Sequence, residues 1–323
     1  MVGVGAAWLT GCDLVRLTKQ PSRVPRIGHL SVNPRSTNES GWHGFLEGLR
    51  ENGWVDGQNI TIEWRDADGA TERLSGLATD LARLPVDVIV TGTAAGVVAA
   101  TQASNTIPVV MMAVSDPVAS GLISSLARPG GRVTGTATPL ATQLTAKRIE
   151  FLKEAVPNIA RVAILWNPAN PAEATAFGEA QIAASAAGMQ LQSLQVRVPD
   201  DFVAAFEAVT QGRAEALLDG GGPVLANSRK RILDFAATKR TPVIGRARPW
   251  VEDGALMSYG ANATDQWRQA ASYVDKIIRG TSPAVLPVEL PTTFELLVNQ
   301  RTAQTLGITF GPSFLDQVTD VIQ

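Results

Sequence analysis

The sequence has few of the residues that build metal centres, disulfide frameworks and acid–base catalytic sites. Its 323 residues include one cysteine, Cys12, and two histidines, His29 and His43. So few residues cannot form a Cys/His zinc site or a set of disulfides. A general base would therefore have to be a carboxylate or a lysine. We expect no metal and no cofactor.

A strong charge of either sign is also missing. The 28 basic and 30 acidic residues leave a net charge of −2, which provides no field for nucleic acid and no polybasic membrane patch. No run of 18 uninterrupted apolar residues occurs, so no segment is predicted to span a membrane as a helix. Apolar residues make up 45% of the chain, as in folded soluble proteins, and the length suggests about two domains.

The first 25 residues differ from the rest. Residues 2–11 are small and apolar, and Leu9-Thr10-Gly11-Cys12 looks like a bacterial lipobox, in which the thiol of Cys12 carries a diacylglycerol. No Lys or Arg precedes this stretch, so the true start may lie upstream of Met1. The alternative is an ordinary unmodified cysteine. We expect residues 1–25 to be an export segment and tether, with the chain anchored outside the cytoplasmic membrane.

From Arg26 onward, short apolar runs alternate with segments of helical periodicity. Such runs are typical of buried parallel strands and predict strands at 27–32, 86–90, 108–114, 162–166, 216–218 and 242–244. Helical stripes occupy the intervening segments, the clearest at 264–280. This alternation, together with the length, predicts an α/β protein of two doubly wound parallel-sheet lobes.

Known enzyme motifs are absent from the sequence. It contains no GxxxxGK[ST], GxSxG or HExxH, and residues 31–36 lack the glycine fingerprint of a dinucleotide site. His29 lies within an apolar strand and is interpreted as a core residue, whereas His43 is interpreted as a surface residue.

Small polar residues follow several predicted strands, where ligands of open α/β sheets bind. Each has an alternative structural explanation. Thr91-Gly92-Thr93-Ala94 could hold a carboxylate or simply cap a helix, and Ser115-Asp116 could simply start one. Trp166 could stack on a flat ligand or pack in the core. Asp219, which precedes three glycines, could receive an amine or lie in a flexible turn. Either Arg246 or Arg248 could bind a carboxylate through its guanidinium fork.

The chain resembles the substrate-binding lipoproteins of bacterial ABC transporters related to the tryptophan/tyrosine-binding type. The resemblance runs in order over residues 26–310. It is carried by GFLEGL at 44–49, GWVDGQNI at 53–60, VDVIVTGTAA at 86–95, IPVV at 107–110, DPV at 116–118, LARPGG at 126–131, GALMSYG at 254–260, IRG at 278–280 and LVNQ at 297–300.

This resemblance implies a type I periplasmic-binding fold whose chain crosses three times between lobes. The lobes would be 26–137 plus 261–287, and 138–260 plus 288–323. Many relatives carry Val-Asp-Tyr where this chain has Ala261-Asn262-Ala263. An amide cannot ion-pair with an ammonium group, so a small carboxylate or aromatic solute is as good a candidate as an amino acid. The predicted ligand-binding residues are Asn33, Thr91, Gly92, Thr93, Ala94, Ser115, Asp116, Trp166, Asp219, Arg248 and Asn262.

The predicted function is that of a monomeric, extracytoplasmic receptor that captures a small solute in an interlobe cleft and passes it to an ABC permease. No covalent chemistry is needed. The alternatives are a sensory module without transport and a Rossmann-type enzyme. A two-lobed repressor is excluded because the N-terminal 25 residues cannot supply a helix-turn-helix.

Overall fold

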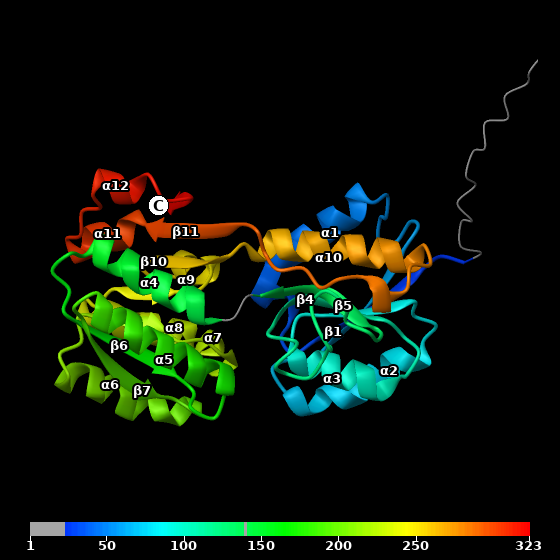
Figure 1. Cartoon of the computed structure of the whole chain (residues 1–323), viewed down its shortest axis with the longest axis horizontal. Coiled ribbons are helices and arrows are strands. Elements are labelled where there is room, and N and C mark those ends of the chain that lie inside the picture. Colours follow the sequence, from blue (N-terminus) through cyan, green and yellow to red (C-terminus); the bar gives the residue numbers. More distant parts are fainter. Residues whose placement is uncertain (1–22, 139–140) are drawn as a thin grey trace, which may run out of the picture.

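The computed structural model describes residues 23–138 and 141–323 and consists of two lobes, each built on its own sheet (Figure 1). The predicted lipobox and Cys12 lie outside the described residues. Of the predicted tether, Arg23 is held against the first lobe by its guanidinium, which lies 2.7 Å from the Asp87 carboxylate. No helix in the described part of the chain is long and apolar enough to cross a membrane.

Lobe 1 contains a five-stranded parallel sheet in the order β2-β1-β3-β4-β5. Its strands are β1 (Arg26–Ser31), β2 (Thr61–Asp66), β3 (Val88–Thr91), β4 (Val109–Ser115) and β5 (Val133–Thr138). Helices α1 (Glu39–Glu51) and α10 (Ala263–Ile278) cover one face, and α2 (Leu74–Arg83) and α3 (Ala94–Ala103) cover the other (Figure 1). Short 3-10 turns lie at η1 (Arg35–Asn38), η2 (Thr71–Arg73) and η4 (Pro283–Val285).

The two helices on the first face come from distant parts of the sequence and contact each other closely. A Cβ atom at Gly44 or Gly48 of α1 would collide with the backbone carbonyl of Thr264 or Arg268 on α10. The missing side chains therefore let the two helix backbones approach. This contact fastens residues 263–278 to the lobe formed by residues 26–138.

Lobe 2 contains a seven-stranded sheet in the order β12-β11-β10-β9-β8-β6-β7. Its strands are β6 (Arg161–Trp166), β7 (Gln190–Gln195), β8 (Ala216–Asp219), β9 (Val243–Gly245), β10 (Met257–Ala261), β11 (Phe294–Asn299) and β12 (Asp320–Ile322). Its helices are α4 (Ala141–Ala155), α5 (Pro171–Ala186), α6 (Phe202–Gln211), α7 (Pro223–Asn227), α8 (Arg229–Lys239), α9 (Arg248–Glu252), α11 (Gln300–Leu306) and α12 (Pro312–Leu315), with a 3-10 turn η3 (Pro199–Asp201). The sheet is not wholly parallel, because β11 runs antiparallel to β10.

The chain passes between the lobes three times, from β5 to α4, from β10 to α10, and from η4 to β11. The third passage begins later than the sequence predicted. Val288 and Glu289 still donate backbone hydrogen bonds to Leu126 and Gly135 of lobe 1. These bonds keep residues 288–289 on lobe 1, although the resemblance had placed them with lobe 2.

Candidate functional site

The carboxyl ends of both sheets lie beside the passages between the lobes. Strand β5 of lobe 1 ends at Thr138, just before the chain enters lobe 2, and β10 of lobe 2 ends at Ala261, just before it returns. Parallel strands end on the same edge of a sheet, so the residues after β1, β3 and β4 share one edge. Those after β6, β8 and β9 share the matching edge of lobe 2. Ligands of open α/β sheets bind at such edges.

In lobe 1, the residues after β3 form the start of α3. Thr93 is the N-cap, and its hydroxyl accepts a hydrogen bond from the Gly96 amide at 3.1 Å. Ala94 is the first helical residue. Thr91 is fully buried, and its hydroxyl oxygen has no hydrogen-bond partner. A Cβ atom at Gly92 would lie 3.3 Å from the Trp267 ring. The N-cap explanation of Thr93 therefore holds, and Thr91 is left with an unused polar atom.

The residues at the end of β4 and just after β1 and β4 make hydrogen bonds within lobe 1. Ser115 accepts a hydrogen bond from the Thr138 hydroxyl at 2.9 Å. The Asp116 carboxylate accepts from the Ala119 amide at 3.1 Å, and Asp116 has a left-handed backbone with φ of +39°. The Asn33 amide donates to the Ser31 hydroxyl at 3.2 Å. These contacts are compatible with the structural explanation of each residue, and their ligand roles stay predictions.

Three tryptophans, Trp42, Trp64 and Trp267, gather near the same edge of lobe 1. Trp42 meets each of the other two edge-to-face, with ring centroids 4.7 Å apart. Trp267 lies within the helical stripe that the sequence predicts at 264–280, whereas no sequence pattern indicated Trp64. The Arg35 guanidinium lies over the Trp64 ring, 4.2 Å from its centroid. We call these three residues the tryptophan group.

His29 lies beneath the tryptophan group. Its side chain is 1% exposed and contacts Trp42 edge-to-face at 4.2 Å. Its Nδ1 lies 3.5 Å from the Asp66 carboxylate, and neither of those two atoms has a hydrogen-bond partner. Burial, with a smaller contribution from the nearby Arg35 charge, lowers the pKa of His29 to about 3. His29 is therefore a neutral core residue, as its sequence context indicated.

Lobe 2 holds a group of charged side chains at its matching edge, three of them buried and Arg246 partly exposed. The group consists of Asp219, Arg246, Arg148 and Glu173, and we call it the ionic cluster. The Asp219 side chain is 3% exposed and lies 3.4 Å from Nε of Arg246. Its other oxygen accepts a hydrogen bond from the Gly221 amide at 2.9 Å. Burial raises the pKa of Asp219, and the nearby Arg246 and Arg148 charges oppose that rise. Arg148 donates to the Tyr259 carbonyl at 2.8 Å, and burial lowers its pKa to about 9.

The three glycines after Asp219 allow the backbone to approach these charges. Gly221 and Gly222 have φ of +110° and +85°. A Cβ atom at Gly221 would collide with the Arg246 guanidinium, and one at Gly222 would collide with the Glu173 carboxylate. Glu173 accepts hydrogen bonds from the Asn167 amide at 2.7 Å and from the Asn170 side chain at 2.9 Å. Sequence analysis singled out Asp219 and named Arg246 as one of two candidate arginines. It did not indicate Arg148 or Glu173, because they come from helices distant in the sequence.

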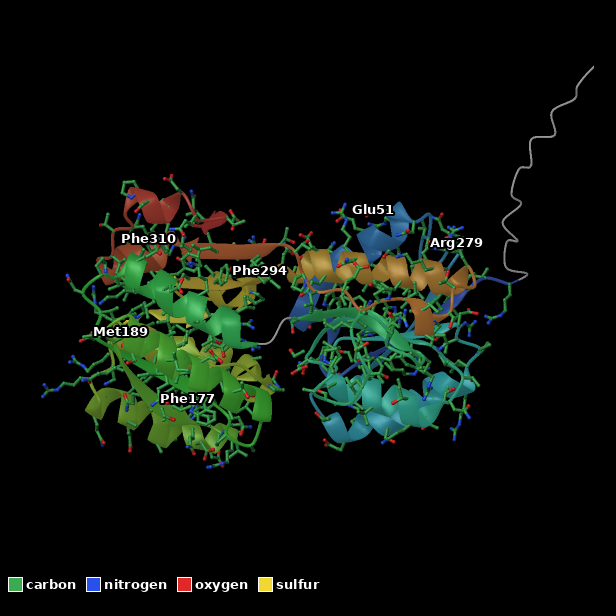
Figure 2. The ribbon with its side chains drawn as sticks, viewed as in Figure 1. Glu51, Phe177, Met189, Arg279, Phe294 and Phe310 are labelled. Atoms are coloured by element: carbon green, nitrogen blue, oxygen red, sulfur yellow. The ribbon has the colours of Figure 1, made fainter. Side chains whose placement is uncertain are left out.

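Two other predicted ligand-binding residues, Trp166 and Arg248, contact side chains of the protein itself. The Trp166 indole N–H donates to the Ser193 hydroxyl at 2.8 Å, and its ring stacks on that of Phe177, with centroids 4.6 Å apart. Phe177 lies on α5 and is labelled in Figure 2. Arg248 lies 2.9 Å from the Asp320 carboxylate and 3.8 Å from that of Glu295.

Asn262 caps α10. Its side-chain oxygen accepts from the Asp265 amide at 3.0 Å, and its side-chain nitrogen donates to Glu295 at 2.9 Å. Both ends of the Asn262 amide are therefore used within the protein.

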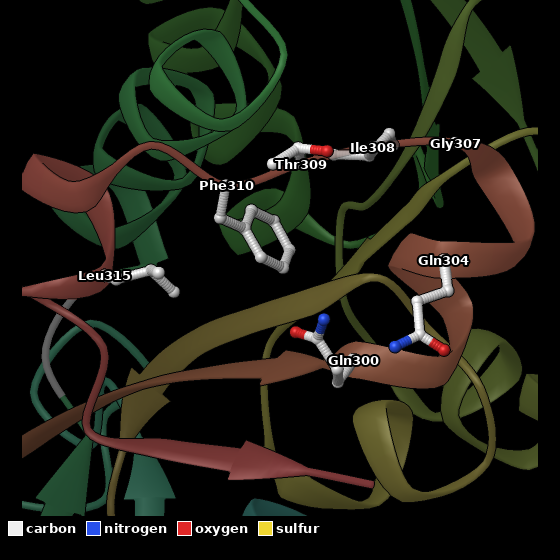
Figure 3. A pocket seen from close by; sticks show the side chains of 7 residues that line it. All are labelled: Gln300, Gln304, Gly307, Ile308, Thr309, Phe310 and Leu315. Atoms are coloured by element: carbon white, nitrogen blue, oxygen red, sulfur yellow. The ribbon is translucent and has the colours of Figure 1, made fainter.

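A separate pocket of about 390 Å³ lies on lobe 2, away from the sheet edge described above (Figure 3). It lies between α11 and the segment leading into α12, and its lining includes Gln300, Gln304, Phe310 and Leu315. Within the described ranges, no group of three or more His, Cys, Asp or Glu side chains is placed to hold a metal ion.

Residues 36–322 match the family model described as ABC transporter substrate binding protein, so the chain belongs to this family of extracytoplasmic, non-enzymatic solute receptors. A curated relative, a tyrosine-binding protein of Clostridioides difficile, is 24% identical over 94% of this chain and 90% of its own length.

Two solved structures share the fold. A domain from Streptococcus pneumonia in complex with L-Trp has a TM-score of 0.83 at 23% identity, covering 93% of this chain and all of the other. A conserved domain protein from Vibrio cholerae has a TM-score of 0.82 at 25% identity, with the same coverage. The chain thus has the two-lobed periplasmic-binding fold that the resemblance predicted, with two mainly parallel sheets.

Proposed function

We propose that this chain is the receptor of an ABC importer and that it traps a small aromatic or apolar solute carrying a carboxylate between its lobes. The main support is the pairing of two unlike surfaces at the edges beside the interlobe passages. Lobe 1 has the start of α3 and the partly buried Trp64, backed by the buried Trp42 and Trp267. Lobe 2 has the partly exposed Arg246, backed by the buried members of the ionic cluster. An aromatic body and a charged end would find complementary partners there.

The proposed ligands include aromatic amino acids and aromatic acids that lack an amine. The Asn262 amide already makes hydrogen bonds to Asp265 and Glu295 and carries no charge to pair with an ammonium group. An amine-free acid is therefore as good a candidate as an amino acid. The relatives named for tyrosine and tryptophan support the aromatic part of the proposal.

Capture would occur by closure of the lobes about their three connections. A ligand favours the closed state only through contacts that it makes better there than in the open state. Groups on both lobes must therefore touch the solute. The proposal also includes a monomeric receptor, held at the membrane by a lipid on Cys12 and delivering to a permease.

Thermal unfolding of the purified chain against a solute panel tests the proposed ligand class. The panel contains L-tryptophan, L-tyrosine, L-phenylalanine, indole-3-propionate and benzoate, with glucose and L-lysine as controls. A ligand at 100 times its Kd adds about 2.7 kcal/mol, which raises Tm by several degrees in a chain of this size. We expect shifts from aromatic carboxylates only. No shift from any of them, or a shift from glucose or lysine alone, would contradict the proposal.

A further inference from the structure

Two arginines follow β9, and they differ in how their charge is compensated. Arg248 is engaged by the carboxylates of Asp320 and Glu295. Arg246 forms one ion pair, with the Asp219 carboxylate 3.4 Å from its Nε, and that nitrogen is buried without a hydrogen bond. The Glu173 carboxylate also interacts with the Arg246 charge. The side chain of Arg246 is 36% exposed, so the rest of its guanidinium can be reached from outside.

The other charged groups of the ionic cluster have less to offer a ligand. Arg148 is 2% exposed and donates to Tyr259 and Thr145. Glu173 is 5% exposed and accepts two hydrogen bonds from the segment before α5. Arg246 is therefore the more accessible cation of the cluster.

The surroundings of Arg246 place its guanidinium at the edge of lobe 2 beside the interlobe passages, in a setting suited to a planar anion. Its guanidinium lies against the bare backbone of Gly221, where any side chain would displace it. The backbone carbonyl of Arg246 lies against Gly260. Gly260 is two residues before Asn262, where the chain begins its passage into lobe 1. A guanidinium has five N–H donors in a flat fork whose geometry matches a carboxylate.

We infer that Arg246 binds the carboxylate of the solute, whose aromatic part then extends toward the tryptophan group of lobe 1. This inference rests on the proposed function and deepens it. It specifies that lobe 2 recognises the anionic end of the ligand, and that the ligand must be an acid. It also replaces Arg248, the residue chosen from the sequence, as the carboxylate receptor.

The test combines matched ligands with matched variants, measured by titration calorimetry on the full chain. L-Tryptophan, indole-3-propionate and tryptamine share the indole ring, but only the first two carry a carboxylate. We expect tryptamine to bind the unaltered chain at least about 100-fold more weakly than the better acid, since a fork to a carboxylate contributes more than one charge-assisted hydrogen bond. This comparison uses only the unaltered chain, so its result does not depend on whether a variant folds.

The variants are Arg246→Gln, Arg246→Lys and the control Arg248→Gln. We expect Arg246→Gln to weaken binding of the acids by about 30-fold or more and to leave tryptamine binding unchanged. Arg246→Lys should fall between Arg246→Gln and the unaltered chain, because lysine retains the charge without the fork. Arg248→Gln should stay within about twofold. Circular dichroism and Tm establish that each variant is folded.

The outcomes separate the inference from the proposed function. If the acids bind the unaltered chain but tryptamine binds equally well, or if folded Arg246→Gln binds the acids normally, the inference is overturned and the receptor function stands. If neither the indole acids nor the aromatic carboxylates of the solute panel bind, the proposed ligand class fails and the inference fails with it. Weaker acid binding by folded Arg246→Gln, with normal acid binding by Arg248→Gln, supports both the inference and the proposed function.

Discussion

The two lobes share an architecture, but different types of side chain lie at the carboxyl ends of their sheets. Lobe 1 surrounds its edge with a neutral histidine and three tryptophans, which pack through edge-to-face contacts. Lobe 2 places four ionisable groups within its edge, three of them almost fully buried. Aromatic rings need only shape-matched neighbours, whereas buried ions need opposite charges and hydrogen bonds.

This difference means that the two edges respond to different disturbances. Removing one member of a buried ion set leaves the others uncompensated, so lobe 2 is sensitive to the loss of a single charge. The edge of lobe 1 includes a histidine that must stay neutral, so lobe 1 is sensitive to added protons. Three measurements can break or sharpen this comparison.

The largest effect is expected from Asp219→Asn. It removes the carboxylate between Arg246 and Arg148 in the interior of lobe 2, and breaking a buried pair typically costs about 3–5 kcal/mol. The control is Asp253→Asn, which breaks a surface pair with Arg229 and should cost less than about 1 kcal/mol. Urea unfolding measures both, and hydrogen exchange should place the loss in lobe 2. Equal small effects would show that the ionic cluster contributes little to stability.

A smaller effect is expected from acid through His29. In the unfolded chain its pKa is near 6.5, and in the folded chain it is about 3. Between these values the unfolded state binds a proton that the folded state does not, so stability is lost as pH falls from 6.5 toward 3. At pH 5 the loss is about 2 kcal/mol relative to pH 7, at about 1.4 kcal/mol per pH unit.

Comparison of His29→Gln with His43→Gln, which alters an exposed histidine on α1, isolates this contribution. The acid-dependent loss measured by urea unfolding should shrink in the first variant and persist in the second. A loss of the same size in both variants would show that acid destabilises the protein elsewhere.

The last pair of effects, of opposite sign, concerns two helical glycines of lobe 1. Gly48→Ala forces a Cβ against the α10 backbone and should destabilise by about 1–3 kcal/mol. Gly76→Ala on α2 has no atom within 4 Å of the added Cβ and should stabilise by about 0.5–1 kcal/mol. Thermal unfolding of the pair measures both signs. If Gly48→Ala also stabilised, the close contact between α1 and α10 would not be what joins the distant segments of lobe 1.

Sequence reasoning found the strands that carry continuous apolar runs and missed strands that lack them. The six predicted strands became β1, β3, β4, β6, β8 and β9, which lie within the two sheets and carry continuous apolar runs. The missed strands include the edge strand β7, whose sequence QLQSLQ is mostly polar, and β5, made of small residues and threonines. Strand β7 is largely exposed, so its polar residues interrupt any apolar run, whereas β5 is buried but is made of residues too small or too polar to form one.

The candidate site divides in the same way. Strand-end reasoning found Thr91 and Asp219, because the position after a buried strand is visible in one stretch of sequence. It could not find Trp64 or Arg148, since their nearness to the site depends on how separate elements pack. It chose Arg248 over Arg246, and only the folded chain shows that the carboxylates of Asp320 and Glu295 lie beside the Arg248 guanidinium.

The sequence by itself determined the alternation of strands and helices, the two-lobed class and the absence of the common catalytic motifs, because these depend on local periodicity and composition. The tertiary structure decided which charges meet, which arginine lies beside two carboxylates and which tryptophans gather at one edge. Those properties depend on contacts between residues such as Arg148 and Asp219, which are far apart in the sequence and are brought together only by packing of the complete lobe.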